Sequence, residues 1–504
     1  MAIFLTLLAI YIVAMIYLGY RGSKKAKSVA GYATSNGDVG PVFTAITFAA
    51  CFASAGTFLG VAGQGFAYGI TNVWFWASQW APCAIILAIV VRRYRKMSMG
   101  FKSVTVADWI AERYQSQGLR VFLALVSMLQ ILYVASQLVG VGIIMEQMIP
   151  AISYEMGVII SAVVIIIYIC MGGSYAHIYT NVAQGAMMVL VGIIIALTGF
   201  FLFGNIFTEV PARLAEIDPN LAAPLNPTNT GYPHWIHVVG LFAAHFWWAL
   251  NPQLINKATY LKTDRDIKKF IILTALFMFL MSGVVLAGSY TRILLPEGLG
   301  ETIPNMDNAV PWFVEQVYPL FMSAVFLVVI VAAMMSTVDG ILLYMSSVLG
   351  STMYKDILIR KKIASGEISM EKADKNAMRI MQWSVVIIGI IAAPMAFSRP
   401  ENVTNMLWTA AGTIMSAVAG PVCIGLYSKR TSKAAAVLGS VGGCAIYSVL
   451  FFGGIIPSVY LCCGIGGLAS VLLTLVGTYI FKPMDKEFAD KVFSHLELKG
   501  SDEE

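Results

Sequence analysis

Long apolar runs alternate with short polar connections along almost the whole chain. A helix needs about 20 apolar residues to cross a bilayer, and by that measure the sequence predicts about thirteen membrane-spanning helices. They are expected at residues 2–20, 41–69, 71–91, 121–147, 156–171, 178–203, 235–254, 269–290, 319–353, 380–397, 403–427, 434–454 and 457–481. The predicted fold class is therefore an all-α polytopic membrane protein with a single transmembrane domain over residues 1–504.

Two of the predicted spans contain residues that interrupt a regular helix. The second carries Ser54, Gly56 and three further glycines, and the seventh reads "WWALNPQLIN", with Asn251 before Pro252. Backbone groups freed by such breaks must be satisfied by protein or by a bound ion. The breaks are five spans apart, which predicts that spans 2–6 and 7–11 are inverted repeats meeting at a site near the midplane. The alternative is that the glycines only let helices pack closely.

This arrangement divides the chain into five parts. We expect a leading helix and loop at residues 1–40 and a first repeat at 41–203. A second repeat is expected at 235–427, followed by two trailing helices at 434–481 and a tail at 482–504. None of the polar connections is long enough to fold as a catalytic domain, and a membrane sensor would need a signalling module that the short tail does not supply. The sequence therefore predicts a protein that is not an enzyme.

Composition and charge agree with a multi-pass protein of the plasma (inner) membrane. Of the 504 residues, 58% are hydrophobic and 12% charged, whereas soluble domains are about a quarter charged. All but three of the 33 basic residues follow odd-numbered spans; the exceptions are Arg213, Arg292 and Arg399. Because basic loops stay in the cytoplasm, we expect the N-terminus outside and the C-terminus inside. The net charge of +6 thus predicts no nucleic-acid partner, and the seven cysteines form no pattern typical of a zinc site or disulfide frame.

A polar face in the ninth span is the first candidate for chemistry. In "AAMMSTVDGILLYMSSVLG", Ala333, Ser336, Thr337 and Gly340 share one helical face. Ser336 lies 19 residues before Lys355, or about 28 Å along a helix, which is well inside a bilayer. Two hydroxyls plus carbonyls from a broken neighbour suit an alkali cation such as sodium. The alternative is that both hydroxyls bond back to carbonyls of their own helix.

The chain resembles the sodium:solute symporter family over nearly its whole length. The motifs are "FLGVAGQGFAYG", "GGSYAHIYTNVAQG", "NPQLINKATYLKTD" and "AAMMSTVDGILLYMSSVLGSTMYKDI", the last being the most specific. The resemblance implies a LeuT-type five-plus-five inverted repeat with one extra helix before it and two after. It also implies Na+ bound by the carbonyls of Ala50, Ala53 and Ala333 and the hydroxyls of Ser336 and Thr337.

The sequence departs from the family at a neighbouring position. Many relatives have an acid where this chain has Asn181, and some use it in a second sodium site. Here a carboxylate stands instead at Asp339, where relatives with that site have a hydroxyl. A carboxylate at this depth is costly and needs a partner, so Asp339, Asn181 and Gly340 are a candidate second cation or proton site. The alternative is a hydrogen-bonded structural aspartate.

The substrate is expected between the two breaks. The candidate contacts are Thr57, Gln79, Gln137, Trp248 and Asn251, each of which has helix packing as its alternative. Amides at half-helix ends can meet an anionic group. This favours sodium-coupled symport of a small carboxylate, such as a monocarboxylate, pantothenate or an amino acid, by alternating access.

Other substrates and couplings stay open. Asn251 matches a polar contact in sugar-carrying relatives, but their lysine in the following span has no counterpart, since residues 270–290 hold no charge. A sugar, polyol or sialic acid carrier is therefore an alternative, and a proton-coupled carrier using Asp339 is another. His177 and His245 are expected to be packing or loop residues. The expected partners are the solute, the sodium ion and the lipid bilayer, with no obligate protein partner.

Overall fold

The computed structural model describes residues 1–25, 28–149, 151–400 and 403–497, and helices dominate this part of the chain. Within it, ten helices are long and apolar enough to cross a membrane. They are Ala2–Ser23, Gly56–Phe101, Gln117–Met148, Gly173–Phe203, Asp266–Leu294, Leu320–Leu358, Met370–Ala396, Val403–Gly425, Lys433–Phe452 and Val459–Ile480. Shorter apolar helices cover Pro41–Phe52 and Tyr154–Ile167. The all-helical membrane class is confirmed, and the number of thirteen spans stays a prediction.

Several of these helices are composed of shorter elements. The N-terminal half contains α1 (Ala2–Ser23), α2 (Val29–Thr34), α3 (Pro41–Phe52), the π-helix η2 (Gly56–Val61), α4 (Ala62–Tyr68), η3 (Gly69–Asn72), α5 (Val73–Phe101), α6 (Val106–Tyr114), α7 (Gln117–Met128), α8 (Ile131–Met148), α9 (Tyr154–Phe203), α10 (Glu209–Ile217) and α11 (Pro219–Ala222). The C-terminal half contains α12 (Trp235–Trp248), α13 (Pro252–Ile255), η4 (Asn256–Tyr260), α14 (Asp266–Met281), η5 (Ser282–Val285), α15 (Leu286–Leu294), η6 (Met306–Asn308), α16 (Ala309–Val317), α17 (Leu320–Ser347), the π-helix η7 (Val348–Leu358), α18 (Arg360–Ala364), α19 (Met370–Ala396), α20 (Val403–Gly425), α21 (Lys433–Phe452), α22 (Val459–Ile480), α23 (Lys486–Ser494) and η8 (His495–Glu497).

The connection predicted over residues 172–177 is not a loop. Helix α9 continues through it and departs from helical dihedrals only at Gly173, where φ is 55° and ψ is −148°. This left-handed conformation is open to glycine at little cost. A single residue therefore replaces the expected loop and divides α9 into two arms.

Helix α17 lies at the centre of the molecule. It packs against α8, α9, α3, α13 and α19, and every residue from Phe326 to Val348 is buried. A helix that is apolar on all sides is typical of such a central position. The polar residues Ser336, Thr337 and Asp339 are therefore surrounded by protein and not by lipid.

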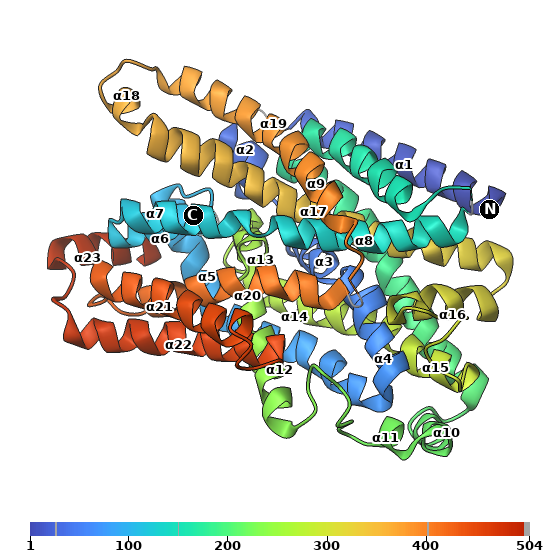
Figure 1. The fold of residues 1–504 in the computed structure, drawn as a ribbon. Coiled ribbons are helices and arrows are strands. Elements are labelled where there is room, and N and C mark those ends of the chain that lie inside the picture. The colour runs from blue at the N-terminus through green and yellow to red at the C-terminus, as the bar shows by residue number, and fades with distance from the viewer. Residues whose placement is uncertain (26–27, 150, 401–402, 498–504) are drawn as a thin grey trace.

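The N-terminus and the last described helices lie at opposite ends of the helical body (Figure 1). The N-terminus lies at the end that carries α10 and α16, and α6, α18 and α23 lie at the other. The tail helix α23 docks at this second end, where Lys96 Nζ donates to the carbonyl of Leu496 over 3.0 Å. The last described residues are therefore held against α5 at this end.

Candidate ion and substrate site

The first break lies between α3 and α4, in the second predicted span. Helix α3 ends at Phe52, Ala53 has an extended backbone (φ −74°, ψ 105°), and helical turns resume at Gly56. The amide of Ala55 donates to Gln137 Oε1 over 2.8 Å, and the amide of Gly56 donates to Ser54 Oγ over 3.2 Å. Protein groups therefore satisfy amides that the break frees, as a membrane requires.

The second break lies between α12 and α13, in the seventh predicted span. Helix α12 ends at Trp248, and α13 starts at Pro252 after Asn251, whose backbone is not helical (φ −52°, ψ 127°). Asn251 Oδ1 accepts a hydrogen bond from Gln130 Nε2 over 3.3 Å. Since α13 packs against both α3 and α17, the two breaks meet beside the central helix, as the sequence predicts.

Neutral oxygens of α3 and α17 come together beside the first break. Ser336 Oγ lies 3.0 Å from the carbonyl oxygen of Ala50 and 2.7 Å from that of Ala333. Thr337 Oγ1 lies 3.2 Å from the Ala333 carbonyl oxygen and 3.4 Å from that of Cys51. We call these five residues the neutral-oxygen cluster. Of the expected ligands, Ala53 lies outside these contacts, at the break itself.

The hydroxyls of Ser336 and Thr337 can be interpreted either as cation ligands or as groups bonded back to their own helix, and the geometry allows the two interpretations to be compared. The bonds to Ala333 are the back-bonds that serine and threonine make in membrane helices. The contacts to Ala50 and Cys51, however, cross to another helix, which back-bonding does not require. All five cluster residues are fully buried, and none brings a charge. Hard neutral oxygens in such a setting fit an alkali cation better than a transition metal.

A second polar group surrounds Asp339. Its carboxylate oxygens lie 3.2 Å from Asn181 Nδ2, from Thr180 Oγ1 and from His177 Nδ1. We call Asp339, His177, Thr180 and Asn181 the carboxylate cluster, and each of them is at most 3% exposed. The predicted proximity of Asp339 and Asn181 is therefore confirmed.

His177 is the member that sequence reasoning missed. We expected a packing or loop residue, whereas the structure places its ring between Asp339 and Cys51, whose Sγ lies 3.6 Å from Nε2. The available signal was the spacing of His177 and Asn181, because residues four apart share a helical face. Gly340 packs closely here: a Cβ added to it would lie 3.0 Å from Cys51 Sγ and 3.1 Å from Gln253 Oε1.

A small cavity lies between the two broken helices and α5 and α20. Three of the five predicted substrate contacts, Thr57, Gln79 and Trp248, line it. Gln79 Nε2 and Trp248 Nε1 are buried and have no hydrogen-bond partner among the described residues. These two nitrogens could therefore donate to a bound molecule, but the cavity, of about 10 Å³, would have to widen to admit one.

The other two predicted contacts are absent from the cavity wall. Gln137 and Asn251 instead hold the two breaks, as described above. The structure adds further lining residues that were not among the predicted contacts: Phe52, Ser54, Gly56, Phe75, His245, Thr404, Leu407 and Trp408. His245 Nδ1 lies 3.0 Å from both the Leu241 carbonyl oxygen and Ser78 Oγ, which fixes its ring. It is a cavity residue and not only a packing residue.

Comparison with known proteins identifies the chain. The family model described as "Sodium:solute symporter family" matches residues 32–443. The chain belongs to the sodium:solute symporter family. As a member, it is a secondary transporter that couples a solute to Na+.

Curated relatives in this family are similar over most of their length. The sodium/pantothenate symporter of Escherichia coli is 26% identical over 460 residues, covering 88% of this chain and 89% of that protein. The high-affinity proline transporter PutP of Bacillus subtilis is 23% identical, covering 92% and 94%.

Solved structures of similar fold are also transporters. A Na+-coupled sialic acid symporter has a TM-score of 0.75 at 18% identity, with 96% of this chain and 99% of that chain covered. Mhp1, a nucleobase-cation-symport-1 family transporter, has a TM-score of 0.58 at 14% identity, with 93% and 99% covered. At these identities the likeness shows the fold alone, which is that of LeuT-type transporters.

Proposed function

We propose that this symporter carries a small polar solute with a carboxylate group and binds it in the cavity between the broken helices. The observation behind the proposal is the pair of unpaired donors, Gln79 Nε2 and Trp248 Nε1, in a cavity lined by no charged side chain. A buried donor without a partner is costly, and a carboxylate supplies two acceptor oxygens. Pantothenate and proline, the solutes named for two relatives, both carry a carboxylate.

A sialic acid, named for one structural neighbour, combines a carboxylate with many hydroxyls and is the second candidate. Uptake into proteoliposomes separates these classes. We expect a labelled monocarboxylate, pantothenate or amino acid to accumulate with a sodium gradient, and sugars without a carboxylate to stay outside. Accumulation of an uncharged sugar alone would contradict the carboxylate assignment.

We further propose that the coupling ion binds at the neutral-oxygen cluster. The ligands would be the carbonyls of Ala50, Ala53 and Ala333 with the hydroxyls of Ser336 and Thr337. A bound Na+ would attract oxygens of both α3 and α17 and so hold the two helices together. Both hydroxyls would then turn their lone pairs toward the ion. Four of these five residues already lie within hydrogen-bond distance of one another in the structure.

The role of the carboxylate cluster follows from its donors. Asp339 already accepts from Asn181 and Thr180, so a cation entering here would first have to displace them. We propose that Asp339 holds α9 against α17 in this conformation. The second cation or proton site at Asp339, Asn181 and Gly340 then forms only after α9 has moved.

We propose thirteen spans in the LeuT-type order, with repeats at 41–203 and 235–427, two trailing helices at 434–481 and a cytoplasmic tail at 482–504. In the plasma membrane, the end that carries α10 and α16 would face outward. A cysteine placed in residues 220–230 should then react with an impermeant thiol reagent from outside, and one in residues 366–375 should not. The reverse pattern would overturn the orientation.

A further inference from the structure

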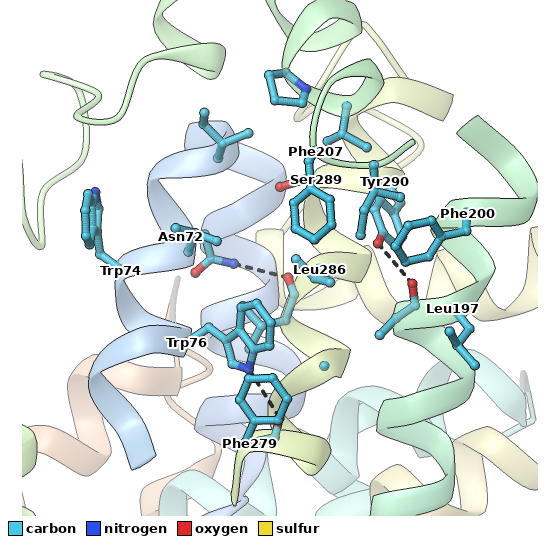
Figure 2. Close-up of a pocket in the computed structure, with 18 of the residues that line it drawn as sticks. Asn72, Trp74, Trp76, Leu197, Phe200, Phe207, Phe279, Leu286, Ser289 and Tyr290 are labelled. Carbon is cyan, nitrogen blue, oxygen red and sulfur yellow. Dashed lines mark hydrogen bonds between the residues drawn. The ribbon is translucent and has the colours of Figure 1, made fainter. Parts of the chain in front are cut away.

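A second cavity, of about 440 Å³, shares no lining residue with the site described above and lies where α5, α9, α14 and α15 meet (Figure 2). Its walls are almost wholly apolar and include Trp76, Phe200, Phe207 and Phe279. The short helix α10 covers one end with Val210 and Pro211. The cavity is therefore large enough for a small-molecule ligand by the usual range of a few hundred Å³.

The polar side chains in this cavity donate their hydrogen bonds within the protein. Asn72 Nδ2 donates to the Val285 carbonyl, Trp76 Nε1 to the Phe279 carbonyl and Tyr290 OH to the Ala196 carbonyl, over 3.2, 3.2 and 3.3 Å. Trp74 Nε1 and Ser289 Oγ are likewise bonded to carbonyls. No charged side chain lines the walls. Apart from Asn72 Oδ1, which has no partner among the described residues, the walls offer a polar solute nothing to replace its lost water, so an apolar occupant fits the cavity best.

The rim of the cavity faces the bilayer. Leu197, Phe200 and Phe279 belong to helices long and apolar enough to cross a membrane, and they are 49%, 42% and 38% exposed. In a membrane protein such exposed apolar side chains contact lipid. The acyl chains of the surrounding lipids are therefore the apolar groups that can enter the cavity through this opening.

A basic residue stands beside the covered end. Arg213 lies on α10, three residues after Val210, and its guanidinium carbon is 5.4 Å from the ring of Phe203 at the end of α9. Arg213 is solvent-exposed and makes no salt bridge within the described residues. Guanidinium groups bind phosphate in a fork geometry, so the headgroup of a lipid whose chain enters the cavity would find a partner here.

We propose that this cavity binds one phospholipid of the outer leaflet, with an acyl chain between α5, α9 and α15 and its phosphate at Arg213. The walls include η5, the irregular turn between α14 and α15, through Gly283 and Val285. An acyl chain in the cavity would therefore lie beside η5, where the helix formed by α14 and α15 already departs from regular geometry. This site is independent of the proposed substrate and sodium assignments.

The test is photo-crosslinking in vesicles of phosphatidylethanolamine and phosphatidylglycerol that contain a trace of phosphatidylglycerol with a diazirine in its acyl chain. After washing in detergent, peptides are mapped by mass spectrometry. We expect labelling of the cavity residues to exceed that of the exposed face of α19 around Trp383 by about fivefold or more, because chain burial slows exchange. Equal labelling of both faces would show ordinary lipid contact and overturn the proposal.

Two variants make the test specific. Leu286→Trp fills the cavity and should abolish its labelling, whereas Leu276→Trp, on the 46% exposed lipid face of α14, should leave it unchanged. Arg213→Gln should lower the labelling about fivefold, the effect of about 1 kcal/mol for one basic residue at an anionic surface. Sodium-dependent uptake and unchanged α19 labelling confirm that each variant is folded. Cavity labelling that survives Leu286→Trp would contradict the proposal.

Discussion

The neutral-oxygen cluster and the carboxylate cluster lie two residues apart on α17 and face different partners. Ser336 and Thr337 meet carbonyls of the broken helix α3, whereas Asp339 meets amide, hydroxyl and imidazole groups of α9. The first group consists of two hydroxyls and three carbonyls, all uncharged, and the second pairs one carboxylate with several donors. The same helix thus offers neutral oxygens to α3 and a charged acceptor to α9.

This difference matters because the two clusters connect α17 to different neighbours, α3 and α9. An ion at the first cluster would tie α17 to α3. Asp339 already ties α17 to α9. The comparison therefore predicts that changes at the carboxylate cluster affect folding most, and that changes at the neutral-oxygen cluster affect mainly the response to sodium.

The largest expected effect is that of Asp339→Ala on stability. It would remove the acceptor that Asn181, Thr180 and His177 share. Asn181 Nδ2 and Thr180 Oγ1 keep backbone carbonyls of α9 at 2.8 and 3.0 Å, so the main loss is the contact of His177 and the links from α9 to α17, and a buried group left unsatisfied costs about 1 to 3 kcal/mol. We expect a clear fall in the melting temperature of the purified protein and loss of transport. The control is Asp38→Ala, whose exposed side chain pairs with Lys262. A melting temperature equal to that of the control would show that the hydrogen bonds of Asp339 do not stabilise the packing of α9 on α17.

The next effect is coupling between Asn181 and Asp339. Asn181→Asp alone places two carboxylates about one hydrogen-bond length apart and should impair transport, because like charges in a buried site repel. Combining it with Asp339→Ser restores a single acid and should recover part of the activity. A double-mutant cycle on uptake rate should give a coupling energy of about 1 to 3 kcal/mol. Additive effects would show that the two residues act separately.

The polar cavity should respond differently from both clusters. Gln79→Glu replaces a donor with a carboxylate and should raise the KM for a carboxylate solute about tenfold, or about 1.4 kcal/mol. The side-chain oxygen that accepts from Ser282 Oγ is kept, but the new carboxylate is buried, so the melting temperature should also fall and uptake is compared per folded protein. An unchanged KM in proteoliposome uptake would remove Gln79 from the substrate contacts.

The smallest effect is expected at Trp248. Trp248→Phe keeps an aromatic ring beside Trp408, whose centroid is 4.2 Å away, and removes only the unpaired N–H. Loss of one hydrogen bond to the solute should raise KM about threefold to tenfold, since such bonds contribute about 0.5 to 1.5 kcal/mol. If KM changed for neutral analogues as much as for carboxylates, the ring and not the N–H would be the contact.

The sequence predicted the helical membrane class and both broken helices because proline, glycine and apolar length act locally. It also brought Ser336, Thr337 and Ala50 to one place through family resemblance. Helical spacing alone could not place Gln137 and Asn251, because a polar side chain near a break can face either the cavity or the freed backbone. His177 was missed for a related reason: its partner Asp339 is 162 residues away, and only the packing of α9 on α17 joins them.

The central claim, that sodium binds at the neutral-oxygen cluster, is tested most directly by sodium titration of solute uptake in Ser336→Ala and Thr337→Ala. Each variant removes one ligand oxygen from a site with about five, so the sodium concentration for half-maximal uptake should rise about tenfold, which corresponds to about 1.4 kcal/mol. The melting temperature in sodium-free buffer should stay close to that of the wild type. Half-saturation at the wild-type sodium concentration in both variants would contradict the claim and leave the two hydroxyls as back-bonded residues of α17.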